Sequence, residues 1–283
     1  MFHKTVIAVW LSVVVALVAS AQTTRVVHFN TTDYVGIAGT YYPVDQPHVP
    51  AVLLIHSVHR DRNVWADFAT LLQHNGLAVL AIDLRGHGES DRKLTAEGPV
   101  KIDSRDLTSR DYQDMLLDVE AAVNWLQAQP GIDGKHVALI GESVGANIAL
   151  RYAAVNEDLA AVVLFSPGIN YRGIRTDDVM HQFGRTPFHI FVSQNDAFAF
   201  ESSKQLIEIH QELGTDTATN ELTVCTGSLH GAEMLKSVRN LPQMTLAWLK
   251  EALVALPSQL ITPPPPVSKP APAPAHETTA PAK

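Results

Sequence analysis

Residues 136–154 read HVALIGESVGANIALRYAA, and this stretch decides the fold. It opens with His136–Ile140, an apolar run without polar alternation, which is typical of a strand buried on both faces of a sheet. It closes with Ala146–Ala154, whose small residues predict a helix packed closely on that sheet. The Gly-Glu-Ser-Val-Gly segment between them is a G-x-S-x-G turn, in which a sharp change from strand to helix exposes the hydroxyl of Ser143. The stretch therefore predicts a strand, a tight turn and a helix, with a serine at the turn.

The same alternation of buried strands and helices extends to both sides of this unit. Unbroken apolar runs predict strands, and apolar residues at i, i+3 and i+4 predict helices. The expected strands are 26–29, 35–42, 51–55, 77–82, 136–140, 160–165, 189–192 and 221–225. The expected helices are 64–72, 112–126, 146–154, 202–213 and 232–253. Alternating strands and helices imply right-handed crossovers, so the expected class is α/β, with a mostly parallel twisted sheet and helices on both faces.

In such a sheet, functional side chains gather in the loops after the carboxyl ends of the strands. Asp196 follows the strand expected at 189–192, and His230 follows the one expected at 221–225. Taken singly, Ser143 and Asp196 have the ordinary reading of helix or turn caps, and His230 that of a surface histidine. Taken together, in this chain order and at three strand ends, they predict a catalytic triad. Ser143 is the expected nucleophile, His230 the base, and Asp196 the acid that orients the base.

With these residues in place, the sequence resembles the α/β-hydrolase family over roughly Val35 to Leu253. Asp83-Leu-Arg-Gly-His-Gly-Glu-Ser90 is similar to the D-x-R-G-H-G-x-S segment of that family, and Leu53-Leu-Ile-His-Ser-Val58 resembles its strand followed by His-Gly-x. The resemblance implies a serine hydrolase whose oxyanion hole is made by the N–H groups of Val58 and Val144. Open, cap-poor members of the dienelactone-hydrolase and esterase type are the most similar. Dienelactone-hydrolase-like members typically carry a cysteine where this chain has a serine.

One position departs from the family pattern. Ser57 stands where the family usually has a glycine. If that glycine has a positive φ, a serine there costs about 1 kcal/mol or more. The loop would then run differently, and the expected position of the Val58 N–H would change with it.

No metal or cofactor is expected. His56 and His59 offer two imidazoles to a metal, but no third ligand lies nearby in the sequence. His56 and His87 are instead expected to form hydrogen bonds with loop backbones. The single cysteine, Cys225, lies within an expected strand and is predicted to be a small core residue.

The two ends of the chain differ from the middle. Residues 1–21 carry Lys4, an apolar run and an Ala-x-Ala pattern, which predicts a signal peptide cleaved before Gln22 and export to the periplasm or the outside. An uncleaved anchor is the alternative, although the apolar run is shorter than the roughly 18 residues of a spanning helix. After cleavage no stable membrane insertion is expected. Residues 257–283, rich in Pro and Ala, are expected to be a disordered tail or an extended spacer. Residues 22–256 remain as one domain.

Charge and loop length bear on the partner. With 21 Lys and Arg against 29 Asp and Glu, the net charge of −8 disfavours nucleic acid as a partner. The segment Ser166–Pro187, where this fold usually carries a lid, has only 22 residues, so no large cap domain is expected. Its arginines are predicted to be solvated, with an acidic substrate as the alternative; they are Arg172, Arg175 and Arg185.

The expected function is an exported serine hydrolase that cleaves small carboxylic esters through an acyl-enzyme. Two alternatives remain open. One is an acyltransferase or peptidase on the same triad. The other is a non-catalytic envelope binding protein on a hydrolase scaffold.

Overall fold

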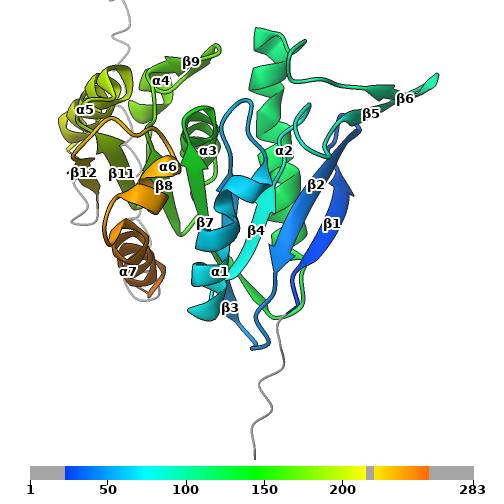
Figure 1. Cartoon of the computed structure of the whole chain (residues 1–283), viewed down its shortest axis with the longest axis horizontal. Helices are drawn as coiled ribbons and strands as arrows, with labels where there is room; N and C mark the ends of the chain where they lie inside the picture. Colours follow the sequence, from blue (N-terminus) through cyan, green and yellow to red (C-terminus); the bar gives the residue numbers. More distant parts are fainter. Residues whose placement is uncertain (1–22, 215–219, 255–283) are drawn as a thin grey trace, which may run out of the picture.

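A computed structural model describes residues 23–214 and 220–254 (Figure 1). Its strands are β1 (Arg25–Asn30), β2 (Val35–Tyr42), β3 (Val49–Ile55), β4 (Ala78–Ile82), β5 (Arg92–Thr95), β6 (Gly98–Lys101), β7 (Ile132–Glu142), β8 (Ala161–Phe165), β9 (Asn170–Tyr171), β10 (Ile174–Arg175), β11 (Phe188–Ser193) and β12 (Glu221–Cys225). Ten of these form one sheet in the order β12-β11-β8-β7-β3-β4-β2-β5-β6, with β1 paired to β2. The strands from β12 to β4 are parallel, and the others are added antiparallel. The mostly parallel sheet is therefore confirmed.

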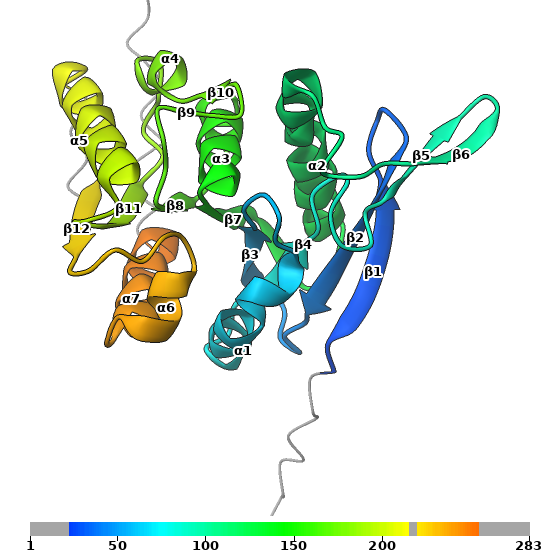
Figure 2. The same ribbon diagram turned by 45° about the horizontal axis from the view of Figure 1, so that its top comes forward.

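Helices cover both faces of the sheet (Figure 2). The first face carries α2 (Ser109–Gln127), α3 (Val144–Val155) and α5 (Ala197–Glu212), and the second carries η1 (Arg62–Trp65), α1 (Ala66–His74), α6 (Glu233–Ser237) and α7 (Leu241–Val254). Strand β3 shows why its apolar run has no alternation. Leu53 and Ile55 belong to the core on the first face, and Val52 and Leu54 to the core on the second. All four side chains are fully buried, as a central parallel strand requires.

The helix expected over 232–253 is two helices. Val238 is extended at the end of α6, and Asn240 has a φ of +62°. Pro242 then lies in the first turn of α7, where its missing N–H needs no partner. The chain changes direction at these residues. The single apolar pattern over 232–253 is therefore shared by two helices with different axes.

Other element ends also differ from the pattern. Helix α2 begins at Ser109 rather than at residue 112, because Thr108 and Asp111 form a reciprocal capping box. Helix α5 begins at Ala197, five residues earlier than expected. The polar segment between β4 and α2 is not only a loop, since it contains the β5–β6 hairpin. The crossover after β8 holds the short hairpin β9–β10 and α4 (Asp177–Met180), so the absence of a large cap from the described part of the chain agrees with the expectation.

The carboxyl ends of the parallel strands lie at one edge of the sheet. The register pairs Ile55 with Ile82 and with Gly141, and Glu142 with Phe165. The loops after β3, β7, β8, β11 and β12 therefore open on the same side of the molecule. The signal peptide and the Pro-rich tail expected from the sequence lie outside the described residues. Within those residues, no helix is both long and apolar enough to cross a bilayer.

Candidate active site

Ser143 lies in a strained turn between β7 and α3. Its φ is +53° and its ψ is −119°, a backbone conformation that costs a residue with a side chain about 1–3 kcal/mol. The turn is so tight that a Cβ at Gly141 would collide with the backbone of Gly145, and one at Gly145 would collide with the carbonyl of Ile55. The Ser143 N–H donates to the Phe165 carbonyl at 2.8 Å, which holds the turn against β8. The two glycines are thus required by close approach.

His230 and Asp196 meet across two neighbouring loops. The distance from His230 Nδ1 to Asp196 Oδ2 is 2.6 Å, slightly shorter than the roughly 2.7–2.9 Å typical of a charge-assisted N–H···O hydrogen bond. The loops are also joined by the Asn195 N–H, which donates to the Gly227 carbonyl at 3.0 Å. Asp196 is 16% exposed and the His230 side chain is 40% exposed. The carboxylate fixes the proton on Nδ1, so Nε2 is left as an acceptor for a proton from another group.

Tyr171, at the end of β9, lies against both Ser143 and His230. Its ring meets the His230 imidazole edge-on, with 6.2 Å between the ring centroids. Burial and then the charge of Asp196 raise the pKa of Tyr171, while a hydrogen bond with Ser143 lowers it. Among the described residues no hydrogen bond joins Ser143 to His230. The structure therefore brings His230 and Asp196 into direct contact, and places Ser143 and His230 around the same tyrosine.

Glu142, which precedes Ser143, connects the loop after β3 with the loop that carries His230. It is 2% exposed, accepts the Ser57 N–H at 3.1 Å on Oε1, and accepts the Ala232 N–H at 2.7 Å on Oε2. Burial raises its pKa, and these two N–H groups oppose the rise. A Cβ at Gly231 would collide with the same carboxylate. One buried side chain thus fixes both the loop after β3 and the loop that carries His230.

Ser166 adds a second tie. Its hydroxyl accepts the N–H of Gly231 at 3.0 Å, so β8 also holds the His230 loop. Glu142, Ser166 and Tyr171 are not among the site residues predicted from the sequence. Glu142 is the variable position of G-x-S-x-G, and the only sign of its role was a carboxylate at the end of an otherwise apolar strand. No pattern in the sequence pointed to Tyr171.

The loop after β3 presents Val58 beside the turn. His56 donates from Nδ1 to the Ser57 carbonyl at 2.5 Å and accepts the Leu84 N–H on Nε2 at 3.0 Å. Ser57 is not among the described residues with positive φ, so the strain considered for it does not arise. Among the described residues the Val58 N–H has no hydrogen-bond acceptor. Val144 begins α3, so its N–H has no acceptor within the helix either.

The imidazoles of His56 and His87 bond the backbone, as predicted from the sequence. Both ring nitrogens of His56 are used by the backbone, so none is left for a metal, and His87 Nδ1 donates to the Arg85 carbonyl at 3.0 Å. Both predicted loop-backbone roles are confirmed. Within the part of the chain that the structure describes, no group of three or more His, Cys, Asp or Glu side chains could hold a metal ion. Cys225 is buried, and burial raises the pKa of its thiol.

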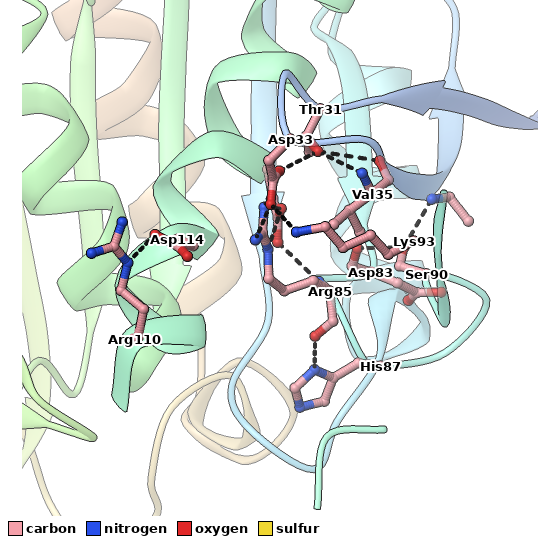
Figure 3. A network of polar contacts seen from close by, with 12 residues as sticks. Thr31, Asp33, Val35, Asp83, Arg85, His87, Ser90, Lys93, Arg110 and Asp114 are labelled. Carbon is pink, nitrogen blue, oxygen red and sulfur yellow. Dashed lines mark hydrogen bonds and ion pairs between the residues drawn. The ribbon is translucent and has the colours of Figure 1, made fainter. Parts of the chain in front are cut away.

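The Asp83–Ser90 segment follows β4 and forms a polar network that does not include Ser143 (Figure 3). The Arg85 guanidinium bonds both oxygens of Asp33 at 2.9 and 3.0 Å, and Asp118 at 2.8 and 2.9 Å. Asp83 accepts the Arg62 backbone N–H at 2.8 Å and pairs with the Arg62 guanidinium. This network connects β1–β2, the loop after β4, and α2, and its role is to support the edge of the sheet.

Comparisons with known proteins agree with this architecture. Residues 46–223 match the family model described as serine aminopeptidase, S33. An uncharacterized protein of Mycobacterium tuberculosis is 33% identical over 144 residues, which are 50% of this chain and 45% of that protein. The polyketide transferase grgF of a Penicillium species is 28% identical over 148 residues, which are 52% of this chain and 46% of that protein. The chain thus spans about half the length of the curated relatives it matches.

A solved structure shows the same fold over more of the chain. Dienelactone hydrolase from Anabaena variabilis superposes with a TM-score of 0.61 at 22% identity, covering 81% of this chain and 97% of that one. At this level of identity the likeness concerns the arrangement of the sheet and helices.

Proposed function

Because the chain belongs to the serine aminopeptidase S33 family of α/β hydrolases, whose model covers residues 46–223, we propose that it is a serine hydrolase that cleaves carboxylic esters. The observation that carries this proposal is the 2.6 Å contact between His230 and Asp196 beside the strained serine turn. A nucleophile, a base and an orienting acid are the three groups that acyl transfer needs.

In the proposed reaction, Ser143 Oγ attacks the ester carbonyl carbon and His230 Nε2 takes the serine proton. The N–H groups of Val58 and Val144 stabilise the resulting oxyanion, and each such donor is worth about 2.7–4 kcal/mol. When the carbon–oxygen bond breaks, His230 gives its proton to the leaving alkoxide. Water then attacks the acyl carbon and loses a proton to His230, and His230 returns that proton to Ser143 Oγ as the acyl carbon–oxygen bond breaks and the acid leaves. Asp196 holds the imidazole in one tautomer throughout.

The shape of the site favours small or moderately bulky esters. The crossover between β8 and β11 carries only a two-stranded hairpin and the four-residue helix α4. The His230 side chain is 40% exposed, so the base is open to solvent. Arg172, Arg175 and Arg185 of the crossover are exposed, and Arg175 pairs with Asp177, which leaves Arg172 and Arg185 as surface charges.

The test combines labelling and turnover. A serine-directed fluorophosphonate should label the protein at Ser143, and the Ser143→Ala variant should neither bind the probe nor hydrolyse p-nitrophenyl acetate. The Ser202→Ala variant is a matched control, because Ser202 is also buried but lies on α5. Esterase activity that survives in Ser143→Ala with an unchanged kcat would refute the assignment. Failure of the wild type to react with either reagent would favour a non-catalytic binding protein.

A second candidate function is acyl transfer, favoured by the similarity to a polyketide transferase. It uses the same acyl-enzyme, but an alcohol or amine replaces water in the second half-reaction. Product partition in the presence of added acceptors distinguishes the two functions. Hydrolysis dominates if the acid remains the main product at high acceptor concentration.

We also propose that the protein is exported after removal of residues 1–21, as their charge and apolar pattern predict. Amino-terminal sequencing of the protein from its native cells should begin at Gln22. A chain that retains Met1 and sediments with membranes would instead indicate an uncleaved anchor.

A further inference from the structure

Two aromatic rings meet at the edge of the candidate active site, Tyr171 from the crossover after β8 and Phe198 from the first turn of α5. Tyr171 and Phe198 lie with their ring centroids 5.3 Å apart, and Tyr171 lies edge-on to His230 at 6.2 Å. Both rings pack over Gly168, where a Cβ would collide with each of them. Phe198 is nonetheless 53% exposed, whereas Tyr171 is partly buried. An exposed apolar surface beside a base is a surface on which part of a substrate can lie.

The hairpin that carries Tyr171 is anchored firmly. Asn147, fully buried on α3, donates to the carbonyls of Gly168 and Ile174 at 2.8 Å each and accepts the Gly168 N–H at 3.0 Å. The Thr176 hydroxyl donates to the same Gly168 carbonyl at 2.8 Å. At the hairpin turn, Arg172 lies 5.8 Å above the ring of Tyr112 on α2. Tyr171 is therefore held at a fixed place relative to Ser143, which begins the same helix as Asn147.

The strand order decides on which side of Ser143 these rings lie. Ser143 follows β7, which lies between β3 and β8 in the sheet. The loop that carries Val58 follows β3, whereas Tyr171 follows β8. Tyr171 is thus on the side away from the Val58 N–H, and it contacts the imidazole that protonates the leaving group. A tetrahedral carbon that points its oxyanion toward Val58 would point its leaving oxygen toward His230 and Tyr171.

The Tyr171 hydroxyl is suited to donate a hydrogen bond there. Burial, and after it the charge of Asp196, raise its pKa, so the phenol keeps its proton at neutral pH. The Ser143 hydroxyl lies beside it and opposes part of that rise. Once Ser143 is acylated, the serine oxygen has become an ester oxygen and is a weak acceptor. The alkoxide that departs is then the strongest acceptor within reach.

We propose that Tyr171 and Phe198 form the subsite for the leaving alcohol, and that this subsite favours esters of aromatic alcohols. It rests on the proposed function and specifies its substrate class. The Tyr171 hydroxyl donates to the leaving oxygen as the carbonyl carbon–oxygen bond breaks, and Tyr171 keeps its own proton. His230 supplies the proton that the alkoxide finally takes. The Phe198 ring stacks with the aromatic group of the alcohol.

The experiment uses two ester series, one with a constant acetyl group and different alcohols, the other with a constant alcohol and different acyl chains. In Tyr171→Phe, kcat/KM should fall about threefold with p-nitrophenyl acetate and about 30-fold with ethyl acetate, because a poorer leaving group depends more on the hydrogen bond. The Phe198→Ala variant should raise KM for phenyl acetate about fivefold more than for ethyl acetate. In the acyl series, neither variant should change the ratio between short and longer chains.

The controls are matched in chemistry and place. Tyr152→Phe alters a buried tyrosine at the far end of α3, and Phe200→Ala alters a ring two residues along the same helix as Phe198. Melting temperatures and circular dichroism identify any variant that fails to fold, and Tyr171→Phe keeps the ring and its packing. Equal losses across all alcohols, or losses that follow the acyl chain, would overturn the subsite. Turnover that does not depend on Ser143 would overturn the proposed function instead, so the two failures are distinguishable.

Discussion

The turn at Ser143 and the Asp83–Ser90 segment both follow parallel strands at the same edge of the sheet, yet their polar groups behave differently. In the segment after β4, Arg85 is saturated by Asp33 and Asp118, and Asp83 by Arg62 and the Glu89 N–H. At the turn, the N–H groups of Val58 and Val144 lack acceptors among the described residues. The His230 ring is partly open to water.

The difference shows how a scaffold and a site can be told apart when both carry a recognisable pattern. A saturated polar group contributes to stability and has nothing left to offer a ligand. A pre-oriented donor or base without a partner costs stability but can act on a substrate. Changes at the turn should therefore affect rates, and changes after β4 should affect unfolding.

The largest effect is expected at the acid of the site. Asp196→Asn should lower kcat by about 10⁴-fold, because the amide can present its N–H to His230 Nδ1 and so favour the wrong tautomer. Steady-state kinetics with p-nitrophenyl acetate measure the loss. Asp178→Asn, which removes a surface partner of Arg151 in the crossover, is the control and should leave kcat within twofold, about 0.4 kcal/mol. A severe loss in Asp178→Asn and a mild one in Asp196→Asn would move the acid into the crossover.

The next effect belongs to the scaffold. Arg85→Met should reduce the free energy of unfolding by about 3–5 kcal/mol, because it leaves the buried carboxylate of Asp118 without its cation. For a domain of this size that is roughly 10 °C in melting temperature. Figure 3 also shows the control, the exposed pair of Arg110 and Asp114 on α2, where Arg110→Met should cost no more than about 0.5 kcal/mol. If Arg85→Met lowered kcat at temperatures where it is folded, the division between scaffold and site would be wrong.

A smaller effect concerns the pH dependence of stability. It involves His56, whose imidazole connects the loop after β3 with the segment after β4. Burial chiefly, and then His87, lower the pKa of His56 to about 3, whereas an unfolded histidine titrates near 6.5. Below about pH 6.5 the unfolded chain therefore binds a proton that the folded chain does not. Stability should fall with falling pH, by about 2 kcal/mol from this residue between pH 7 and pH 5.

Urea unfolding at the two pH values tests this. The difference between pH 7 and pH 5 should shrink by about 2 kcal/mol in His56→Asn, whatever the variant costs at pH 7. His28→Gln, an exposed position on β1, should keep the wild-type difference. An acid loss in His56→Asn as large as that of the wild type would mean that His56 is not a source of acid sensitivity.

The smallest effect is expected at Glu142, which belongs both to the stabilising scaffold and to the candidate active site. Glu142 is fully bonded, like the scaffold, but it holds the loops of Val58 and His230. Glu142→Gln has only one acceptor oxygen for two N–H groups, so we expect kcat/KM to fall about tenfold and stability to fall by less than about 2 kcal/mol. Glu233→Gln, at a surface pair with Arg60, is the control. Wild-type kinetics in Glu142→Gln would show that the clamp does not position the loops.

Much of this architecture could be predicted from the sequence because it depends on local signals. The apolar run of β3 and the two glycines around Ser143 are consequences of burial and close approach within a few residues. Asp196 after β11 and His230 after β12 could be predicted as neighbours, because the carboxyl ends of parallel strands lie at the same edge of the sheet. The family match and the solved fold agree with those predictions.

What could not be predicted depends on contacts across the chain. The role of Glu142 arises from N–H groups 85 and 90 residues away. Tyr171 reaches the site because Asn147 anchors its hairpin through bonds that span 21 and 27 residues. Neither leaves a periodic signal in the sequence. The break between α6 and α7 was missed for a different reason, because one apolar pattern continues through a change of direction.

The bonds from Asn147 also have a kinetic consequence. A strap held by four buried hydrogen bonds to Asn147 and Thr176 is not a lid that opens and closes during each turnover. In the proposed reaction, substrate would then enter and product would leave through an opening of constant width, without a lid movement that limits the cycle. Under that condition, and with fast product release, kcat of the proposed reaction would report the bond-making steps themselves. Solvent viscosity would then slow the proposed hydrolysis only if kcat/KM approached the diffusional ceiling of about 10⁸–10⁹ M⁻¹s⁻¹.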